Sequence, residues 1–255
     1  MKQSNLIIFL LLFSFTAFGQ QLKNVKDALR VKLNDRIYIE SAHSNSITRA
    51  ENVMNDVDNY LSKTPPEIPH LMLSHNSDQK SLPEDKTPSE FNMLKKYRDN
   101  LKKTFQGFSG SQFFYNKENS LPIVFALYGD TALTLIISGI YIDKNYNIQT
   151  LTSKQRSANV ITSYFLPKFR NLVSSLSENE VKYFGMACVF VSRDFSDKSY
   201  VSASAEFVSI IAPKNLITKY VAGDLSEDEL ISSSDIYICD RDMKGAIKKI
   251  KISIE

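Results

Sequence analysis

The stretch Leu121–Leu151, LPIVFALYGDTALTLIISGIYIDKNYNIQTL, is the densest apolar run after residue 19 and predicts a β-meander. Its first run, Leu121–Tyr128, and its second, Thr131–Asp143, are rich in β-branched and aromatic residues. Gly129-Asp130 separates them, and a Gly-X pair between two such runs is typical of a two-residue hairpin. The polar residues at 143–145 are expected to turn the chain into a third strand.

The second run is apolar on both of its expected faces. Strict alternation places Leu133, Leu135, Ile137 and Tyr141 on one face and Ile136, Ile140 and Ile142 on the other. A strand that is apolar on both sides is normally central in its sheet and covered on both faces. We therefore expect layers of structure on both sides of this strand.

The segment Ser153–Leu176 is the expected partner for one face of the sheet. Its apolar residues recur at helical spacing, from Val160 to Leu176. Pro167 interrupts the helix, because proline lacks the backbone donor and its ring clashes with the preceding turn. The apolar pattern keeps its phase across Pro167, which predicts a kinked helix or two abutting helices.

The remaining elements are expected in groups. The pattern predicts helices over 22–33, 47–61, 87–107, 213–222 and 226–233, and strands over 36–41, 113–115, 181–191, 200–212, 235–240 and 246–254. Strands connected as hairpins, with helices between the groups, favour an α+β fold over a doubly wound parallel one. We predict a mainly antiparallel sheet packed against the Pro-kinked helix, with an N-terminal helical part.

Residues 1–19 have the pattern of a secretory signal peptide. Lys2 precedes the unbroken apolar run Leu6–Phe13, and Ala17-Phe18-Gly19 places small residues before a cleavage site. The apolar run is too short to span a bilayer, and no later segment is long enough either. The protein is therefore expected in the periplasm or the medium, with no integral membrane segment after cleavage.

The composition of the chain and the position of its prolines indicate how the part after residue 19 is divided. After the signal peptide we expect a helical segment over 20–61, a proline-rich linker or mobile loop over 62–86, and an α+β domain over 87–255. The chain has 31 basic and 28 acidic residues, and its net charge is +3. This near-balance gives no support to nucleic-acid binding through phosphate neutralisation.

Cys188 and Cys239 are the two cysteines of the chain, and both fall in predicted strands. An oxidising compartment permits a disulfide between them, and the alternative is two buried thiols that behave as small apolar side chains. Two cysteines and three scattered histidines do not make a metal site, so none is expected. No phosphate-binding glycine motif occurs, and no cofactor is expected.

The candidates for catalysis are four polar residues. Ser111 lies in a Gly/Ser loop, and Asp240 and Asp242 follow a predicted strand end. His43 is the remaining candidate. None of the four belongs to a recognised catalytic motif, so a site would have to be assembled in three dimensions.

Aromatic residues gather around the same loop and are the candidates for ligand binding. These candidates are Phe108, Phe113 and Tyr115. An aromatic cluster either stacks on a ligand or fills the core, and the core is the commoner place for large apolar side chains.

Export, an α+β body and the lack of a catalytic motif favour a non-enzymatic module that binds another protein or a cell-envelope component. One alternative is a small cell-envelope hydrolase whose site is assembled only in the fold. The other is a structural subunit of the envelope that associates with itself through the strand expected at Ala246–Ile254.

Overall fold

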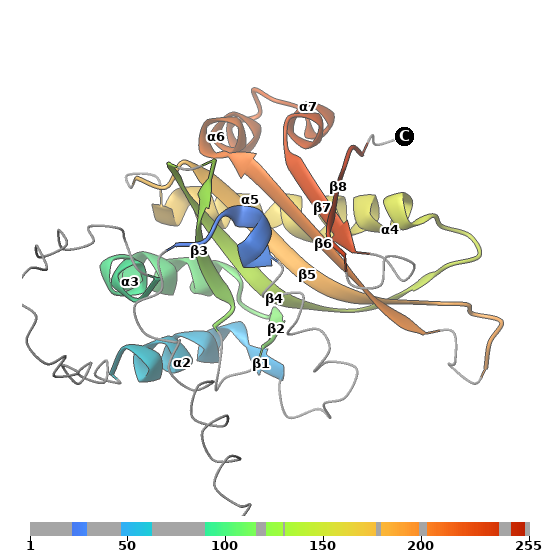
Figure 1. Cartoon of the computed structure of the whole chain (residues 1–255), viewed down its shortest axis with the longest axis horizontal. Helices are drawn as coiled ribbons and strands as arrows, with labels where there is room; N and C mark the ends of the chain where they lie inside the picture. Colours follow the sequence, from blue (N-terminus) through green and yellow to red (C-terminus); the bar gives the residue numbers. More distant parts are fainter. Residues whose placement is uncertain are drawn as a thin grey trace, which may run out of the picture.

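The computed structural model describes residues 22–29, 47–62, 90–115, 121–129, 131–176, 180–198, 203–239 and 246–252. In these ranges, helices surround an eight-stranded sheet in which antiparallel pairs predominate (Figure 1). The prediction of an α+β fold with a mainly antiparallel sheet is confirmed.

The sheet has the strand order β1-β2-β4-β5-β6-β7-β8, and β3 pairs with β4 on the side of β2. The strands are β1 Ile47–Arg49, β2 Gln112–Phe114, β3 Ile123–Tyr128, β4 Ala132–Asn147, β5 Tyr183–Arg193, β6 Ser204–Pro213, β7 Asp235–Cys239 and β8 Lys248–Ile250. Only the β4–β5 pair is parallel among them. A parallel pair needs a long crossover, which here is helical.

Along the chain, the helices of the described residues alternate with groups of strands. They are α2 Ala50–Ser62, α3 Glu90–Gly107, α4 Ser153–Val160, α5 Leu166–Leu176, α6 Lys214–Ala222 and α7 Glu227–Ser232. A π-helical turn, Ile161–Phe165, joins α4 to α5. Among these residues, no helix combines the length and the apolar character that crossing a membrane requires.

The central hairpin forms as expected, but the third strand of the meander does not. β3 and β4 pair antiparallel, and Gly129 supplies a φ of +56° at the turn. β4 then runs without reversal through the polar residues Asp143 and Asn145 to Asn147. Its parallel pairing with β5 continues to Arg193, so this pairing keeps the polar segment extended.

A bulge at Gly139 changes which residues of β4 share a face. Ile137 pairs with Met186 and Ile140 pairs with Cys188, so β4 contains one more residue than β5 between these pairs. Gly139 has a φ of +69°, which glycine adopts without strain. The expected alternation is therefore wrong after Ile137: Ile140 and Ile142 join the face of Leu135 and Ile137, and Tyr141 lies on the other face.

The kinked-helix prediction is confirmed as two helices joined by a π-helical turn. Pro167 is the second residue of α5, where the missing N–H does little harm to the new helix. Thr152 and Gln155 form a capping box at the start of α4. The buried face of this helical pair, which includes Phe165 and Phe169, packs in the same core cluster as the sheet.

The N-terminal segment contributes to the same sheet and core. Ile47–Arg49, expected as the start of a helix, forms β1 and pairs with β2, and α2 follows directly. A helical turn at residues 25–29 packs Val25 and Leu29 on the sheet (Figure 1, blue). The strand expected at 36–41 and the linker expected at 62–86, apart from Ser62, lie outside the described residues.

The two faces of the sheet differ in their cover. One, the helix face, carries Leu135, Ile137 and Ile210, which share a core cluster with residues of α2–α7. The other carries Ile136, Phe207 and Tyr237 and packs on the turn at 25–29. We call the second one the concave face, because the sheet curves around it.

A hydrogen bond across the sheet shows its curvature. The Tyr128 hydroxyl on β3 donates to Asp235 Oδ2 on β7 at 2.7 Å. Three strands separate β3 from β7, and neighbouring strands lie about 4.8 Å apart, so a flat sheet would hold them about 19 Å apart. A tyrosine and an aspartate side chain are too short to span that distance. The sheet therefore curves around the face that carries both residues.

The polar residues of β6 do not form a wet face, although their alternation with apolar residues along the strand is typical of one. Glu206, on the presumed polar side of that strand, is 1% exposed and lies on the helix face. Arg156 of α4, which is 4% exposed, donates to Glu206 Oε2 at 3.2 Å and to Oε1 at 2.6 Å. Ser192 donates to the same carboxylate, and Arg156 also donates to the Leu151 carbonyl. This buried ion pair ties α4 to the centre of the sheet.

Candidate binding pocket on the concave face

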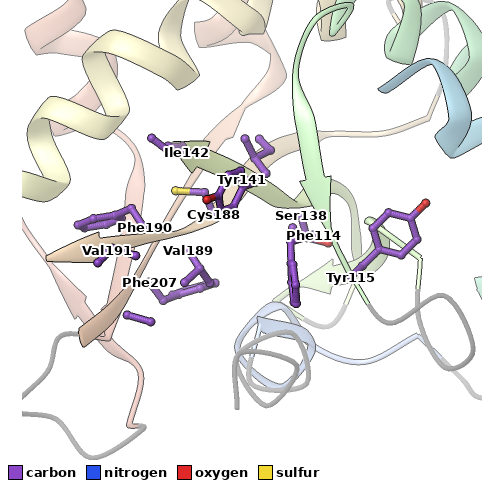
Figure 2. Close-up of a pocket in the computed structure, with 13 residues that line it drawn as sticks. Phe114, Tyr115, Ser138, Tyr141, Ile142, Cys188, Val189, Phe190, Val191 and Phe207 are labelled. Atoms are coloured by element: carbon purple, nitrogen blue, oxygen red, sulfur yellow. The ribbon is translucent and has the colours of Figure 1, made fainter. Parts of the chain in front are cut away.

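An apolar pocket lies over β2, β4, β5 and β6 (Figure 2). Its cavity volume is about 50 Å³. Residues that reach it from the concave face include Phe114, Ser138, Tyr141, Val189, Val191 and Phe207. No Asp, Glu, Lys, Arg or His side chain is among the described residues that line it.

Strand alternation places most of these side chains. On β5, Val189 and Val191 face the pocket because they alternate with Cys188 and Phe190, which face the helices. Val189 pairs with Phe207 on β6, so the two side chains form neighbouring parts of one apolar wall. The bulge at Gly139 adds Tyr141 to this side, as described above.

The aromatic candidates Phe108 and Phe113 belong to the core. Their rings lie 5.9 Å apart, and the Phe105 ring lies 5.3 Å from that of Phe113. All three side chains are at most 1% exposed. Phe113 pairs with Ile140 on the helix face, and the next residue, Phe114, points to the concave face and lines the pocket.

Tyr115 is the one aromatic candidate that lines the pocket. Its hydroxyl donates to Asp56 Oδ2 of α2 at 2.5 Å. Burial, and then this hydrogen bond, raise the pKa of Tyr115 above its ordinary value. The hydroxyl is therefore neutral near pH 7 and occupied by a partner within the fold.

Of the catalytic candidates, only Ser111 is among the described residues; His43, Asp240 and Asp242 lie outside them. Ser111 joins two elements through its backbone. Its N–H donates to the Phe108 carbonyl at 2.8 Å, and its carbonyl accepts from the N–H of Ala50 at 3.0 Å. The nearby Glu51 carboxylate accepts from Ser109 Oγ and Gly110 N–H, so it stabilises the turn between α3 and β2. These contacts give Ser111 a structural role.

Cys188 and Cys239 are buried thiols, and no disulfide joins them. Cys188 belongs to the cluster on the helix face and Cys239 to the cluster on the concave face. β6 lies between their strands. Of the two alternatives that the sequence left open, the structure has the buried thiols.

The groups that line the pocket limit the chemistry that it can support. Cys188 is among the lining residues although its side chain faces the helices, and burial raises the pKa of its thiol, so this sulfur is not the thiolate that nucleophilic attack requires. Across the described ranges, no group of three His, Cys, Asp or Glu side chains is arranged to hold a metal ion. The lining offers apolar surface, aromatic rings and the hydroxyls of Ser138, Tyr115 and Tyr141, of which that of Tyr115 is bonded to Asp56.

The sequence contains part of the signal for this pocket. Phe113 and Phe114 are consecutive residues of β2, so strand alternation places them on opposite faces of the sheet. The pairing of Val189 with Phe207 and the face of Tyr141 both depend on strand order and on the bulge. These are properties of the folded sheet, and one sequence does not reveal them.

The pocket and the sheet that carries it were compared with known proteins. No protein-family model, no curated protein and no solved structure matches the chain.

Proposed function

We propose that the protein is an exported, non-enzymatic binding module that recognises another protein or a cell-envelope component through the concave-face pocket. The observation that carries the proposal is the apolar and aromatic lining of this pocket, which holds no charged side chain. Binding sites are typically concave, mostly apolar and equipped with a few polar groups.

The two alternatives have less support. A hydrolase needs a nucleophile, a base and an orienting group within hydrogen-bond reach of one another, and Ser111 has backbone contacts of a structural kind instead. Self-association through the last strand would need a long free edge. β8 covers only Lys248–Ile250, and its two lysines are exposed on a strand where charge discourages pairing.

The contacts of the first described residues are compatible with a leader that ends at residue 19. Leu22 is 8% exposed and packs in the main core cluster, only three residues after the expected cleavage site at Gly19. The Lys23 carbonyl accepts from the N–H of Leu127 on β3 at 2.9 Å. A leader that ends at residue 19 would leave these contacts intact in the mature protein.

Cleavage after Gly19 is testable by N-terminal sequencing. Expressed with its own leader in a bacterium with an export pathway, the protein is expected in the periplasmic or medium fraction with Gln20 first. Ala17→Arg should block processing and keep the protein in the membrane fraction, because the cleavage site needs a small residue there. Asn5→Gln, in front of the apolar run, should be processed normally. A wild-type protein found uncleaved in the cytoplasm would contradict export.

Recognition through the pocket is testable with two matched valines. Val189 is half-buried in the pocket, and Val221 is half-buried on α6 against the helix-face core. We expect Val189→Asp to reduce retention of the partner from a cell-envelope extract at least tenfold, because a charge in an apolar pocket loses its hydration. Val221→Asp should retain the partner as the wild-type protein does. Retention is measured by quantitative mass spectrometry on the immobilised mature protein.

Two results would contradict the proposed function. One is a partner that Val189→Asp retains as well as the wild-type protein does. The other is hydrolysis of envelope substrates by the purified protein at a rate that Val189→Asp leaves unchanged. The second would favour the hydrolase.

A further inference from the structure

Ser138 presents a buried hydroxyl without a hydrogen-bond partner. Its side chain is fully buried and lines the pocket, and Ser138 Oγ has no partner within the described part of the chain. The backbone of the same residue is satisfied, since its N–H donates to the Pro122 carbonyl at 2.9 Å. A buried hydroxyl that makes no hydrogen bond destabilises the fold, so its presence calls for an explanation.

The bulge places this hydroxyl in the pocket. Ser138 and Gly139 together lie opposite the single residue Ala187, between the pairs made by Ile137 and Ile140. In Figure 2, Ser138 lies beside Phe114, and Phe190 and Val191 lie at the other end of the lining. The Ser138 hydroxyl therefore stands at one end of a mostly apolar surface, whose other side-chain polar groups are the hydroxyls of Tyr115 and Tyr141.

The size and charge of the pocket limit what can enter. A volume of about 50 Å³ is roughly a third of that of a cavity that holds benzene, so the pocket admits only a small group. A charged group would lose its hydration there without gaining a counter-ion, since no charged side chain is among the described lining residues. A neutral group of a few heavy atoms fits both limits.

We propose that the pocket accepts a short, neutral aliphatic group that carries one hydroxyl, and that this hydroxyl bonds Ser138 Oγ. The group belongs to the partner that the proposed function requires, and the inference rests on that function. Ser138 is then the specificity-determining residue of the pocket. The apolar walls hold the hydrocarbon, and Ser138 selects groups that can satisfy its hydroxyl.

Isobutanol and isobutyrate are matched probes for this site, because they share a branched carbon skeleton and differ in charge at neutral pH. In an NMR titration of the mature protein, isobutanol is expected to shift the amide signals of Gly139 and Val189 in a saturable way. Isobutyrate should bind at least tenfold more weakly. Ser138→Ala should weaken isobutanol binding about fivefold, as expected for the loss of one neutral hydrogen bond.

Ser209 provides the matched control. Its hydroxyl is also fully buried and without a hydrogen-bond partner in the described residues, and it lies on β6 opposite Ala187, outside the pocket lining. Ser138→Ala and Ser209→Ala should each leave the Tm of the ligand-free protein unchanged or raise it by up to about 4 °C, because each removes an unsatisfied group. Ser209→Ala should leave isobutanol binding unchanged.

Three results would overturn the inference. Equal binding of isobutanol by Ser138→Ala and the wild-type protein would show that the hydroxyl selects nothing. Equal binding of isobutyrate would show that charge is tolerated. A Tm that falls in Ser138→Ala would show that the hydroxyl is already satisfied in the free protein. If partner retention still depends on Val189 in these cases, the proposed function stands and only the chemistry of the bound group is wrong.

Discussion

Replacing Arg156 with methionine is expected to lower the free energy of unfolding by about 3–5 kcal/mol, because Glu206 then remains as a buried charge without a counter-ion. Both side chains are nearly inaccessible to solvent, at 4% and 1% exposure. The guanidinium donates to both carboxylate oxygens, at 3.2 and 2.6 Å. Urea unfolding, followed by circular dichroism, measures the loss as a shift of the midpoint at constant slope.

Two further variants separate the charge from the packing. Arg156→Met combined with Glu206→Leu should recover much of the loss, because the uncompensated charge is gone and apolar groups fill the space. Lys96→Met breaks an exposed pair with Glu180, in which the atoms are 2.7 Å apart and both side chains are 54% exposed. It should cost less than about 1 kcal/mol. A double variant no more stable than Arg156→Met would contradict the assigned cause.

The ion pair also explains why the alternating pattern around Glu206 does not correspond to an exposed face of the strand. Glu206 stands in a run that alternates apolar and polar residues, a pattern typical of a strand with one wet face. The polar side of β6 is instead covered by α4, and the carboxylate is tolerated there because Arg156 and Ser192 bond to it. Arg156 is 50 residues away in the chain, so no local pattern connects the two.

Local signals elsewhere predicted the structure well. The hairpin between β3 and β4 depends on Gly129, and the capping box of Ser226 and Glu229 starts α7 as expected. Gly223 ends α6 with a φ of +87°. Each of these features is decided by residues within four positions of one another. Turns and helix ends of this kind can be predicted from the sequence, because the residues that form them are close together in the chain.

The pocket shows the opposite case. Its walls come from β2, β4, β5 and β6, which meet only after the α4–α5 crossover has placed β5 beside β4. The candidate Phe113 and its neighbour Phe114, which was not a candidate, differ by one position and therefore by a whole face of the sheet. A cluster of aromatic residues near a glycine thus indicated the right region. Of the three predicted aromatic residues only Tyr115 lines the pocket, next to Phe114, which was not predicted.

Gly139→Ala is expected to be the most damaging change at a single backbone position near the pocket, with a loss of about 3 kcal/mol in the free energy of unfolding. An L-residue at a φ of +69° is strained, by roughly 1–2 kcal/mol. An added Cβ would also lie 2.5 Å from the Phe114 carbonyl oxygen, closer than carbon and oxygen can approach. Overpacking of this kind typically adds about 1–3 kcal/mol.

Gly110→Ala is the matched control, because Gly110 has a φ of +77° and no atom within 4 Å of an added Cβ. It should lose only the backbone contribution, about 1–2 kcal/mol. The difference between the two variants, measured by urea unfolding, isolates the contact between β4 and β2. Because relief of the clash moves β2, and Phe114 with it, Gly139→Ala should also weaken isobutanol binding, whereas Gly110→Ala should not. Equal losses in stability for the two variants would show that β2 does not lie against Gly139, and the pocket would then lack its Phe114 wall.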